Sequence, residues 1–341
     1  MGLFDQEKKH VPIWFMRQAG RYHKHYQGIR SQHDFMTMCK NADLATEITM
    51  GPIEDFDFDA AILFSDLLFP LEQLDMGLTY QNGPPELAWH LDSKEKIGQL
   101  KVVEKSETFY DFQYQALTQL KQKLPETKSL LGFVGAPFTL YTYAVEGSHK
   151  GNLISTKTGL FDGRFEAFFE ILKPVLIENM KVQARANPDA ICLFDTAAGE
   201  LDHVTFHQYA LASMVEVAEE FKKEFPETKV LYYSKCTQLC ELSQFTSGFV
   251  NILGVDWRIP LAKAFDQIDE RFMIQGNLDP CWLFLPWDEL KNRIDHLIAP
   301  IKDNPEWKKR WIFGLGHGVL PKTPESNVRD TVKYIKEQLT I

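Results

Sequence analysis

Short apolar runs recur seven times along this chain, and longer stretches with apolar residues at helical spacing separate them. Continuous apolar runs of this length suit strands that are covered on both faces. When strands and helices alternate in this way, right-handed crossovers are expected to place the strands side by side in a parallel sheet. The expected strands are residues 59–64, 130–134, 190–194, 230–233, 249–255, 272–275 and 311–315.

Closing such a sheet on itself gives a (β/α)8 barrel, and we expect one α/β TIM-barrel domain that spans residues 1–341. An open, doubly wound sheet is the alternative, although no G-x-G-x-x-G follows the first strand, which weakens a dinucleotide-binding version. Helices are expected at residues 165–186, 204–225 and 324–339, and Pro174 predicts a kink or a break in the first of them. Residues 78–91 are expected to form a turn or small hairpin, and residues 93–124 a helix.

Composition and charge exclude several classes of protein. The 341 residues are 44% hydrophobic and 25% charged, with a formal net charge of −10. Nucleic-acid affinity comes largely from basic surface, so no nucleic-acid partner is expected. No apolar run approaches the ~18 residues of a membrane helix, the first residues lack the apolar core of a signal peptide, and the five scattered cysteines do not resemble a disulfide framework. We expect a cytoplasmic protein with reduced thiols and no membrane partner.

A local group of arginines is the best candidate for binding an acidic substrate against this negative background. Arg17 and Arg21 lie four residues apart with Gly20 between them, and Arg30 follows in the same segment. Guanidinium groups are always charged and present a planar fork that fits carboxylates, and the glycine lets backbone approach a ligand closely. The alternative is a solvated surface on which these arginines pair with nearby Asp and Glu.

Polar residues follow the apolar runs, at the end where a barrel of this kind has its active site. Asp66 follows the first run, Thr196 the third and His317 the seventh, and Tyr143 comes soon after the second. Together with the arginines, they suggest a preorganised polar pocket. Each also has a simpler interpretation: Asp66 or Thr196 could belong to a helix cap, and His317, between two glycines, could be an ordinary loop residue.

Longer motifs lie along the whole chain in a fixed order. Residues 12–22 read P-x-W-x-M-R-Q-A-G-R-Y, and residues 132–147 fit G-F-x-G-A-P-[FW]-T-L-x-x-Y-x-x-E-G. Shorter blocks are Phe64-Ser65-Asp66, residues 254–257, residues 275–280, and residues 315–319 followed by Thr323-Pro324. In these motifs the chain resembles the uroporphyrinogen decarboxylase family. It departs from the family pattern at Lys24-His25-Tyr26, at Gly314 and at Lys235-Cys236-Thr237.

The resemblance implies one distorted (β/α)8 barrel and a reaction of haem biosynthesis. In that reaction, uroporphyrinogen III becomes coproporphyrinogen III when four acetate carboxyl groups leave as carbon dioxide. No metal and no organic cofactor is implied, because protonating a pyrrole carbon turns the substrate itself into the electron sink. The resemblance also implies a homodimer.

Roles for individual residues follow from the same resemblance. Asp66 is expected to accept hydrogen bonds from the pyrrole N–H groups and to stabilise the ring cation. Arg17 is expected to bind a substrate carboxylate and to lie in the proton-delivery region, acting through a bound water or the substrate because a guanidinium is a very weak acid. These two and Tyr143 are the expected catalytic residues. The other expected contacts are to substrate carboxylates from Arg21 and Arg30, to a side chain of the reacting ring from Tyr143 and Thr196, and to a propionate from His317.

Two alternatives remain open. One is a zinc-dependent corrinoid or thiol methyltransferase of the same superfamily, whose pattern has H-x-C at a strand end and a distant third thiolate. Here Ser234-Lys235-Cys236 lacks the histidine, and Cys236 and Cys240 alone cannot build a closed zinc site. The other is a non-catalytic tetrapyrrole-binding barrel, against which Asp66 and Tyr143 argue and which a turnover assay would distinguish.

Overall fold

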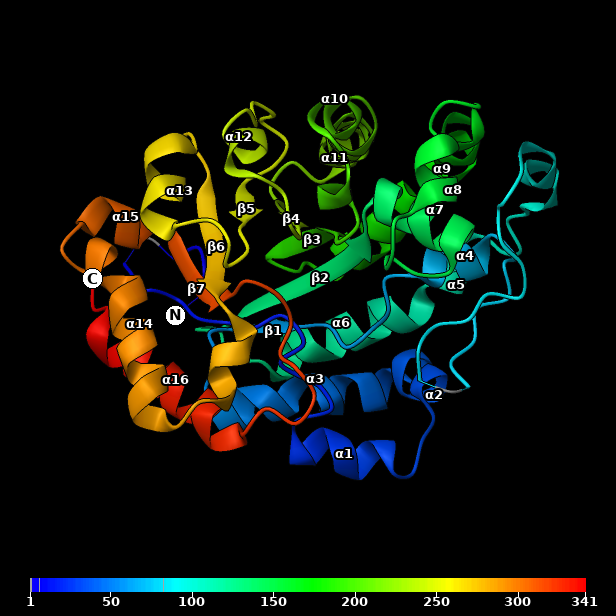
Figure 1. The fold of residues 1–341 in the computed structure, drawn as a ribbon. Coiled ribbons are helices and arrows are strands. Elements are labelled where there is room, and N and C mark those ends of the chain that lie inside the picture. Colours follow the sequence, from blue (N-terminus) through cyan, green and yellow to red (C-terminus); the bar gives the residue numbers. More distant parts are fainter. Residues whose placement is uncertain (1, 6, 82) are drawn as a thin grey trace.

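A seven-stranded parallel sheet forms the centre of the computed structural model, which describes residues 2–5, 7–81 and 83–341 (Figure 1). The strands lie in sequence order, and each pairs in parallel with the next one along the chain. The strands are β1 (Ala60–Ile62), β2 (Ser129–Gly135), β3 (Ala190–Asp195), β4 (Lys229–Ser234), β5 (Ile252–Gly254), β6 (Met273–Leu278) and β7 (Trp311–Leu315). All seven expected strands are present, and the predicted parallel α/β architecture is confirmed.

Apolar side chains fill the inside of the curled sheet. Because successive residues of a strand point to opposite faces, each strand contributes to an inner cluster and to a separate outer cluster beneath the helices. The inner cluster includes Ile62 from β1, Cys192 from β3, Tyr233 from β4 and Ile312 from β7. The inside is therefore a packed core rather than a pore, and a substrate site is expected at the carboxyl ends of the strands.

The segment of residues 12–16 lies between the first and the last strand. The Ile13 carbonyl accepts the Asp59 N–H beside β1 at 2.8 Å, and Ile13 forms a parallel bridge with Phe313 of β7. Trp14 joins the inner cluster and Ile13 the outer one, as neighbours in a strand would. The expected closed, eight-stranded barrel is nevertheless not what the sheet forms: it has seven strands and curls as a half-barrel. Pro12 has no N–H to donate, so the ladder cannot extend before this bridge, and after it the Phe15 N–H donates to Gln18 Oε1 at 3.2 Å.

Helices cover the outer face of the sheet (Figure 1). None of those in the described residues combines the length and the apolar character of a membrane span. The longer ones are α3 (Ala42–Phe56), α6 (Asp111–Lys123), α7 (Pro137–Glu146), α9 (Arg164–Ala184), α11 (Ala212–Glu224), α14 (Trp287–Lys302) and α16 (Glu325–Gln338). The shorter ones are α1 (Lys24–Arg30), α2 (Phe35–Lys40), α4 (Phe69–Gln73), α5 (Ser106–Phe109), α8 (Ile154–Thr158), α10 (His203–Thr205), α12 (Leu239–Leu242), α13 (Leu261–Gln267), α15 (Pro305–Arg310), the 3₁₀ helices η1 (Lys94–Gln99), η2 (Ala198–Glu200) and η4 (Pro280–Phe284), and the π-helical η3 (Phe206–Leu211).

Three of the expected helices form where the apolar spacing places them. The helix at 165–186 is α9, and it continues through Pro174 without a break. The helix at 324–339 is α16. The helix at 204–225 is a succession of α10, η3 and α11, so a π-helical turn interrupts the regular α-helical hydrogen bonding there.

The single helix expected at residues 93–124 is wrong. The structure has three separate pieces, η1, α5 and α6. Between η1 and α5 the backbone turns away to pair with the end of α4: Lys101 N–H donates to Leu74 O at 3.3 Å and Val103 N–H to Gln73 O at 3.0 Å. The small hairpin expected at 78–91 is confirmed by the antiparallel bridge of Thr79 with Glu86, while Asn82 of the expected turn lies outside the described residues.

A buried carboxylate holds the segment of residues 12–16 at its beginning. Asp59 accepts the Ile13 N–H at 2.9 Å and lies 3.1 Å from His10 Nε2, while its other oxygen is 3.1 Å from Lys336 Nζ. Burial works to raise the pKa of Asp59, but His10, Lys336 and the Ile13 N–H together hold it below its ordinary value. The two ends of the chain meet here as well, since His10 bridges Thr340.

Candidate functional site

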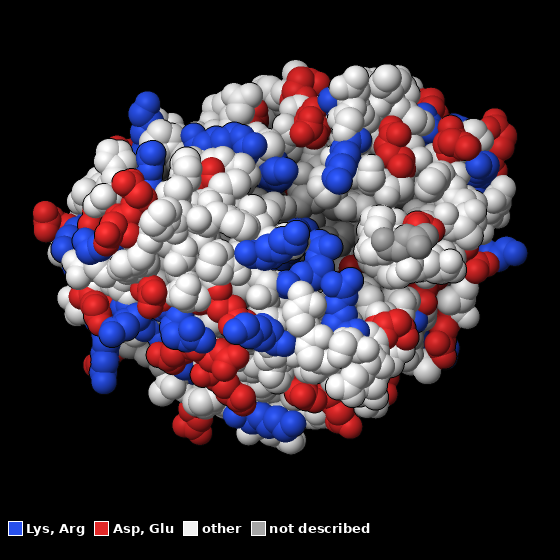
Figure 2. All heavy atoms as spheres, turned by 60° about the horizontal axis from the view of Figure 1, so that its bottom comes forward, with Lys and Arg blue, Asp and Glu red and all other residues white. Residues whose placement is uncertain are grey.

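The loops that follow the strands come together at one end of the sheet, because all strands run in parallel. Asp66, Thr196 and His317 each follow the carboxyl end of a strand, and Tyr143 lies on α7, which follows β2. Figure 2 shows a face that is hollowed near its centre, with Lys and Arg side chains gathered along the hollow. In a protein with a net charge of −10, such a gathering of basic groups is a local exception.

Arg17 occupies an unusual backbone position beside the loop that carries His317. Its φ is +61°, a left-handed conformation that is uncommon outside glycine. A Cβ placed on Gly318 would lie 2.4 Å from Arg17 Cδ, so the arginine stem depends on a glycine at that position. The Met16 carbonyl accepts the Val319 N–H at 2.9 Å and ties the same two segments together.

The three arginines do not form the paired, solvated surface that was the alternative interpretation. Arg17, Arg21 and Arg30 are exposed, and none forms a salt bridge with a carboxylate in the part of the chain that the structure describes. Arg21 and Arg30 act electrostatically on Tyr26, whose ring lies 5.5 Å from that of Phe64. All three guanidinium groups are therefore available to an anionic ligand.

Asp66 is half-buried and lies within the electrostatic reach of Arg17. Its Oδ1 accepts the Leu68 N–H at 2.7 Å, while Leu68 rather than Asp66 precedes α4 as the cap residue. Burial raises the pKa of Asp66 above its ordinary value, and the Leu68 N–H, Tyr80 and Arg17 oppose that rise. The hydroxyl of Tyr80 is buried beside it without a fully formed hydrogen bond to any described residue. Asp66 thus has one structural bond and remaining acceptor capacity.

Tyr143 is held in place by a histidine that the sequence did not single out. Its hydroxyl lies 2.7 Å from His149 Nδ1. Burial and the nearby Asp66 raise the pKa of Tyr143 to about 12. Burial, Lys235 and Arg17 lower the pKa of His149. Both groups are therefore neutral near pH 7, and Tyr143 keeps a proton with which to donate a hydrogen bond.

His317 is an oriented side chain and not a free loop residue. Its ring stacks on that of Tyr233 with centroids 5.9 Å apart, and its Nδ1 lies 3.2 Å from the Tyr233 hydroxyl, which itself donates to Gly316 O at 2.7 Å. Burial, followed by the charges of Arg17 and Lys235, lowers the pKa of His317 to about 3. The imidazole is neutral at physiological pH, so in the free protein it offers hydrogen bonding without charge.

The structure unites most, but not all, of the expected site. Arg17 interacts electrostatically with Asp66, Tyr143 and His317, which makes these four one group. Thr196 is buried directly after β3, and no hydrogen bond in the described residues joins its side chain to that group. Arg21 and Arg30 interact electrostatically with Tyr26, and we call these two arginines the rim.

Other polar residues at the strand ends serve the fold. Asp195 accepts bonds from the Thr139 N–H and hydroxyl, at 3.1 and 2.7 Å, and from Tyr232 at 3.0 Å. Asp256 accepts from the Cys236 N–H at 2.8 Å and pairs with Arg258 at 2.6 Å. Their carboxylates are occupied, unlike that of Asp66.

Sequence reasoning missed several members of this region. Tyr80 and His149 reach it only through tertiary packing, and Lys235 and Arg258 act on His317 across the loops after β4 and β5. Lys235 did carry a signal, since it stands in one of the segments that departs from the family pattern.

Comparisons with known proteins identify the family that the chain resembles along nearly its whole length. The profile of the family described as uroporphyrinogen decarboxylase (URO-D) matches residues 3–338. The uroporphyrinogen decarboxylase of Helicobacter pylori (strain G27) is 34% identical over 341 residues, which is 97% of this chain and 96% of that protein. That of Koribacter versatilis (strain Ellin345) is 32% identical over 339 residues, covering 97% and 93%. Among solved structures, a methyltransferase from Methanosarcina mazei superposes with a TM-score of 0.72 over 97% of this chain and 94% of that chain, at 15% identity, which shows the fold alone.

Proposed function

Because this chain belongs to the uroporphyrinogen decarboxylase family, we propose that it converts uroporphyrinogen III to coproporphyrinogen III in haem biosynthesis. The observation that carries the proposal is that guanidinium groups without a salt-bridge partner in the described residues occur together with one carboxylate, Asp66, that keeps acceptor capacity at the end of the sheet. A porphyrinogen has the complementary chemistry, with carboxylates around its edge and pyrrole N–H donors at its centre.

The reaction needs an electron sink before each acetate carboxyl group can leave. Protonating the pyrrole α-carbon beside the ring carbon that carries the acetate makes the ring an iminium-like cation. The carbon–carbon bond to the carboxylate then breaks, its electron pair neutralises the ring, and carbon dioxide departs. A second proton converts the exocyclic methylene to a methyl group, and the ring carbon then releases the first proton, so that the pyrrole is restored and each decarboxylation takes up one proton in all. The substrate supplies its own sink, so we propose that the decarboxylation requires no metal and no organic cofactor.

Each residue of the group has a task in this scheme. Asp66 accepts from the pyrrole N–H groups and offsets the ring cation electrostatically, which is the largest kind of contribution a preorganised site makes. Arg17 binds a carboxylate beside the reacting ring and lies in the proton-delivery region, passing protons through a water or the substrate. Tyr143, kept neutral, donates to the reacting side chain while the Nδ1–H tautomer of His149 donates to the Tyr143 oxygen, and Thr196 adds a second hydroxyl there.

The outer contacts bind the parts of the substrate that do not react. Arg21 and Arg30 hold carboxylates at the rim, and neutral His317 meets a propionate by hydrogen bonding. Binding energy from such remote groups can position the ring without being lost in the transition state.

The proposed function is tested by anaerobic incubation with uroporphyrinogen III, followed by oxidation and chromatography of the porphyrins. We expect coproporphyrin to accumulate through partly decarboxylated intermediates. Recovery of unchanged uroporphyrin under conditions where a known family member is active would contradict the proposal. A binding titration would then show whether the chain is a non-catalytic tetrapyrrole-binding barrel.

Further properties follow as part of the same proposal. We count the segment of residues 12–16 as the eighth wall element of one distorted (β/α)8 barrel domain. We also propose that the chain works in the cytoplasm and that it forms a homodimer. Sedimentation analysis tests the dimer. The methyltransferase alternative has no support in side-chain placement, because neither Cys236 nor His317 gathers with two other metal-ligating residues in the described parts of the chain.

A further inference from the structure

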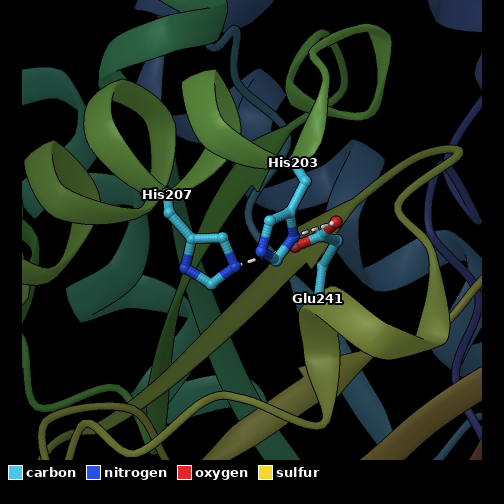
Figure 3. Close-up of side chains that lie close together, drawn as sticks. All are labelled: His203, His207 and Glu241. Atoms are coloured by element: carbon cyan, nitrogen blue, oxygen red, sulfur yellow. Dashed lines mark hydrogen bonds and ion pairs between the residues drawn. The ribbon is translucent and has the colours of Figure 1, made fainter.

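Two histidines and a glutamate, none of them assigned to the substrate, converge on one point. His203 and His207 come from one helical stretch, on α10 and η3, and Glu241 comes from α12 (Figure 3). Glu241 lies 2.9 Å from His203 Nδ1 through one oxygen and 2.8 Å from His207 Nε2 through the other. The three ligand-type atoms all lie within 4.8 Å of one another.

The local backbone brings these side chains to the same place. His203 and His207 are four residues apart, which puts them on one side of a helix, and their rings are 4.6 Å apart. The π-helical turn η3 begins between them, and π-helical turns are frequent at functional sites. Glu241 is supplied from a separate element, so the convergence is a tertiary arrangement.

The three side chains differ in how far they are exposed to solvent. The side chain of Glu241 is 8% exposed, that of His207 28% and that of His203 57%. The carboxylate is thus fixed inside, while the imidazoles face outward and leave a path for an ion and for a solvent ligand.

We propose that His203, His207 and Glu241 form a binding site for a divalent transition-metal ion of the Zn²⁺ type, separate from the decarboxylation site. Two imidazoles and one carboxylate are a known three-residue zinc ligand set that leaves a fourth position open. Imidazole nitrogen favours zinc and its transition-metal neighbours, whereas Mg²⁺ and Ca²⁺ prefer all-oxygen ligands.

The ion links two loops at the carboxyl ends of neighbouring strands. α10 follows β3, and α12 follows β4. The two connections already touch, since a Cβ on Gly199 would lie 2.0 Å from Lys235 O. Lys235 lies between β4 and α12 and acts electrostatically on His149 and His317. An ion at this site therefore fixes the loop that carries Lys235, without taking part in any step of the reaction.

The experiment uses the whole chain after removal of metal with a chelator. Zn²⁺ is titrated against a chromophoric competitor, and thermal unfolding is followed with and without Zn²⁺. We expect one ion per chain, and a rise of several degrees in Tm at about 100 times the Kd. The single variants His203→Gln and His207→Gln should each weaken Zn²⁺ binding by about 100-fold or more, since even changes to the groups that support metal ligands weaken binding about 10- to 100-fold. Because His203 is exposed, its variant keeps the fold.

The matched control is Cys240→Ser, which removes an exposed thiol 3.8 Å from Glu241 Oε1. It should bind Zn²⁺ as the wild type does, and the Co²⁺ complex of the wild type should show no thiolate charge-transfer band. Absence of Zn²⁺ binding, equal binding by both histidine variants and the wild type, or loss of binding in Cys240→Ser would each overturn the proposal. Because the readouts are binding and stability, they are independent of whether the chain decarboxylates uroporphyrinogen.

Discussion

Replacing Asp66 with asparagine separates the charge of this side chain from its hydrogen bond. One carboxylate oxygen accepts the Leu68 N–H at 2.7 Å, and an asparagine carbonyl oxygen can accept the same bond. The variant loses the negative charge beside Arg17 and one acceptor for pyrrole N–H donors. Removing a preorganised electrostatic group of this kind costs about 3–4 kcal/mol of barrier, so kcat should fall about 100- to 1,000-fold.

Stability should respond in the opposite direction. Burial raises the pKa of Asp66 above the ordinary 3.8, so the folded state holds this proton more tightly than the unfolded state does. The contribution of this group to stability therefore falls as pH rises from the unfolded pKa to the folded pKa, and the ionised carboxylate costs the folded state free energy above both. Asparagine has no such cost, and Asp66→Asn should unfold at the same temperature as the wild type or higher at neutral pH.

The assay measures anaerobic turnover of uroporphyrinogen III and thermal unfolding on the same preparations. Asp195→Asn is the matched control, because Asp195 also ends a strand and burial raises its pKa to about 6, but Thr139 and Tyr232 occupy its oxygens. The control should keep turnover close to that of the wild type. A stable Asp66→Asn protein with full turnover would refute the reasoning and leave Asp66 as a structural residue of its turn.

Other perturbations test other parts of the structure. Arg17→Lys keeps the charge but loses the planar fork of the guanidinium group. We expect kcat/KM to fall about tenfold, which corresponds to one lost interaction of ~1.4 kcal/mol. Wild-type kinetics in this variant would show that the fork geometry is unimportant. Asp59→Asn should lower the free energy of unfolding by about 3 kcal/mol at pH 7. The pKa of Asp59 is below its unfolded value, so its stabilisation is present above that value and is lost as pH falls through the folded pKa; urea unfolding at pH 7 and in acid should show the difference from wild type shrinking. Dialysis against a chelator should leave turnover unchanged well below the Tm, and activity that disappears and returns with added metal would contradict a cofactor-independent mechanism.

The strands were predictable because each is covered on both faces and therefore reads as a continuous apolar run. The helix expected at 93–124 failed for the opposite reason. The N–H groups of Lys101 and Val103 donate to carbonyls at the end of α4 instead of within a helix. These carbonyls lie almost thirty residues away, and no local sequence pattern predicts such a distant partner. The prediction that the sheet closes into a barrel failed for a similar reason. Whether residues 12–16 extend a ladder depends on Pro12 and on both edge strands.

Motifs singled out Arg17, Asp66 and Tyr143 because these residues lie in blocks that the chain shares with the family. They did not reveal the environment of these residues. The contact of Arg17 with Gly318 joins positions some 300 residues apart, and His149 reaches Tyr143 through a loop without a recognisable pattern. The spacing of His203 and His207 is visible in the sequence, but Glu241 joins them only after β4 has been placed beside β3.

The segment of residues 12–16 also determines when the site can exist during synthesis. These residues leave the ribosome long before β7 does, yet their place lies against β7, and the stem of Arg17 rests on Gly318. Roughly 300 residues, or about 15–60 s of translation, separate the appearance of Arg17 from that of its support. During that interval the apolar residues Ile13, Trp14 and Phe15 have no final partner on the β7 side and are exposed to chaperones. A growing chain can therefore present the basic site to a porphyrinogen only once β7 and the loop after it have emerged.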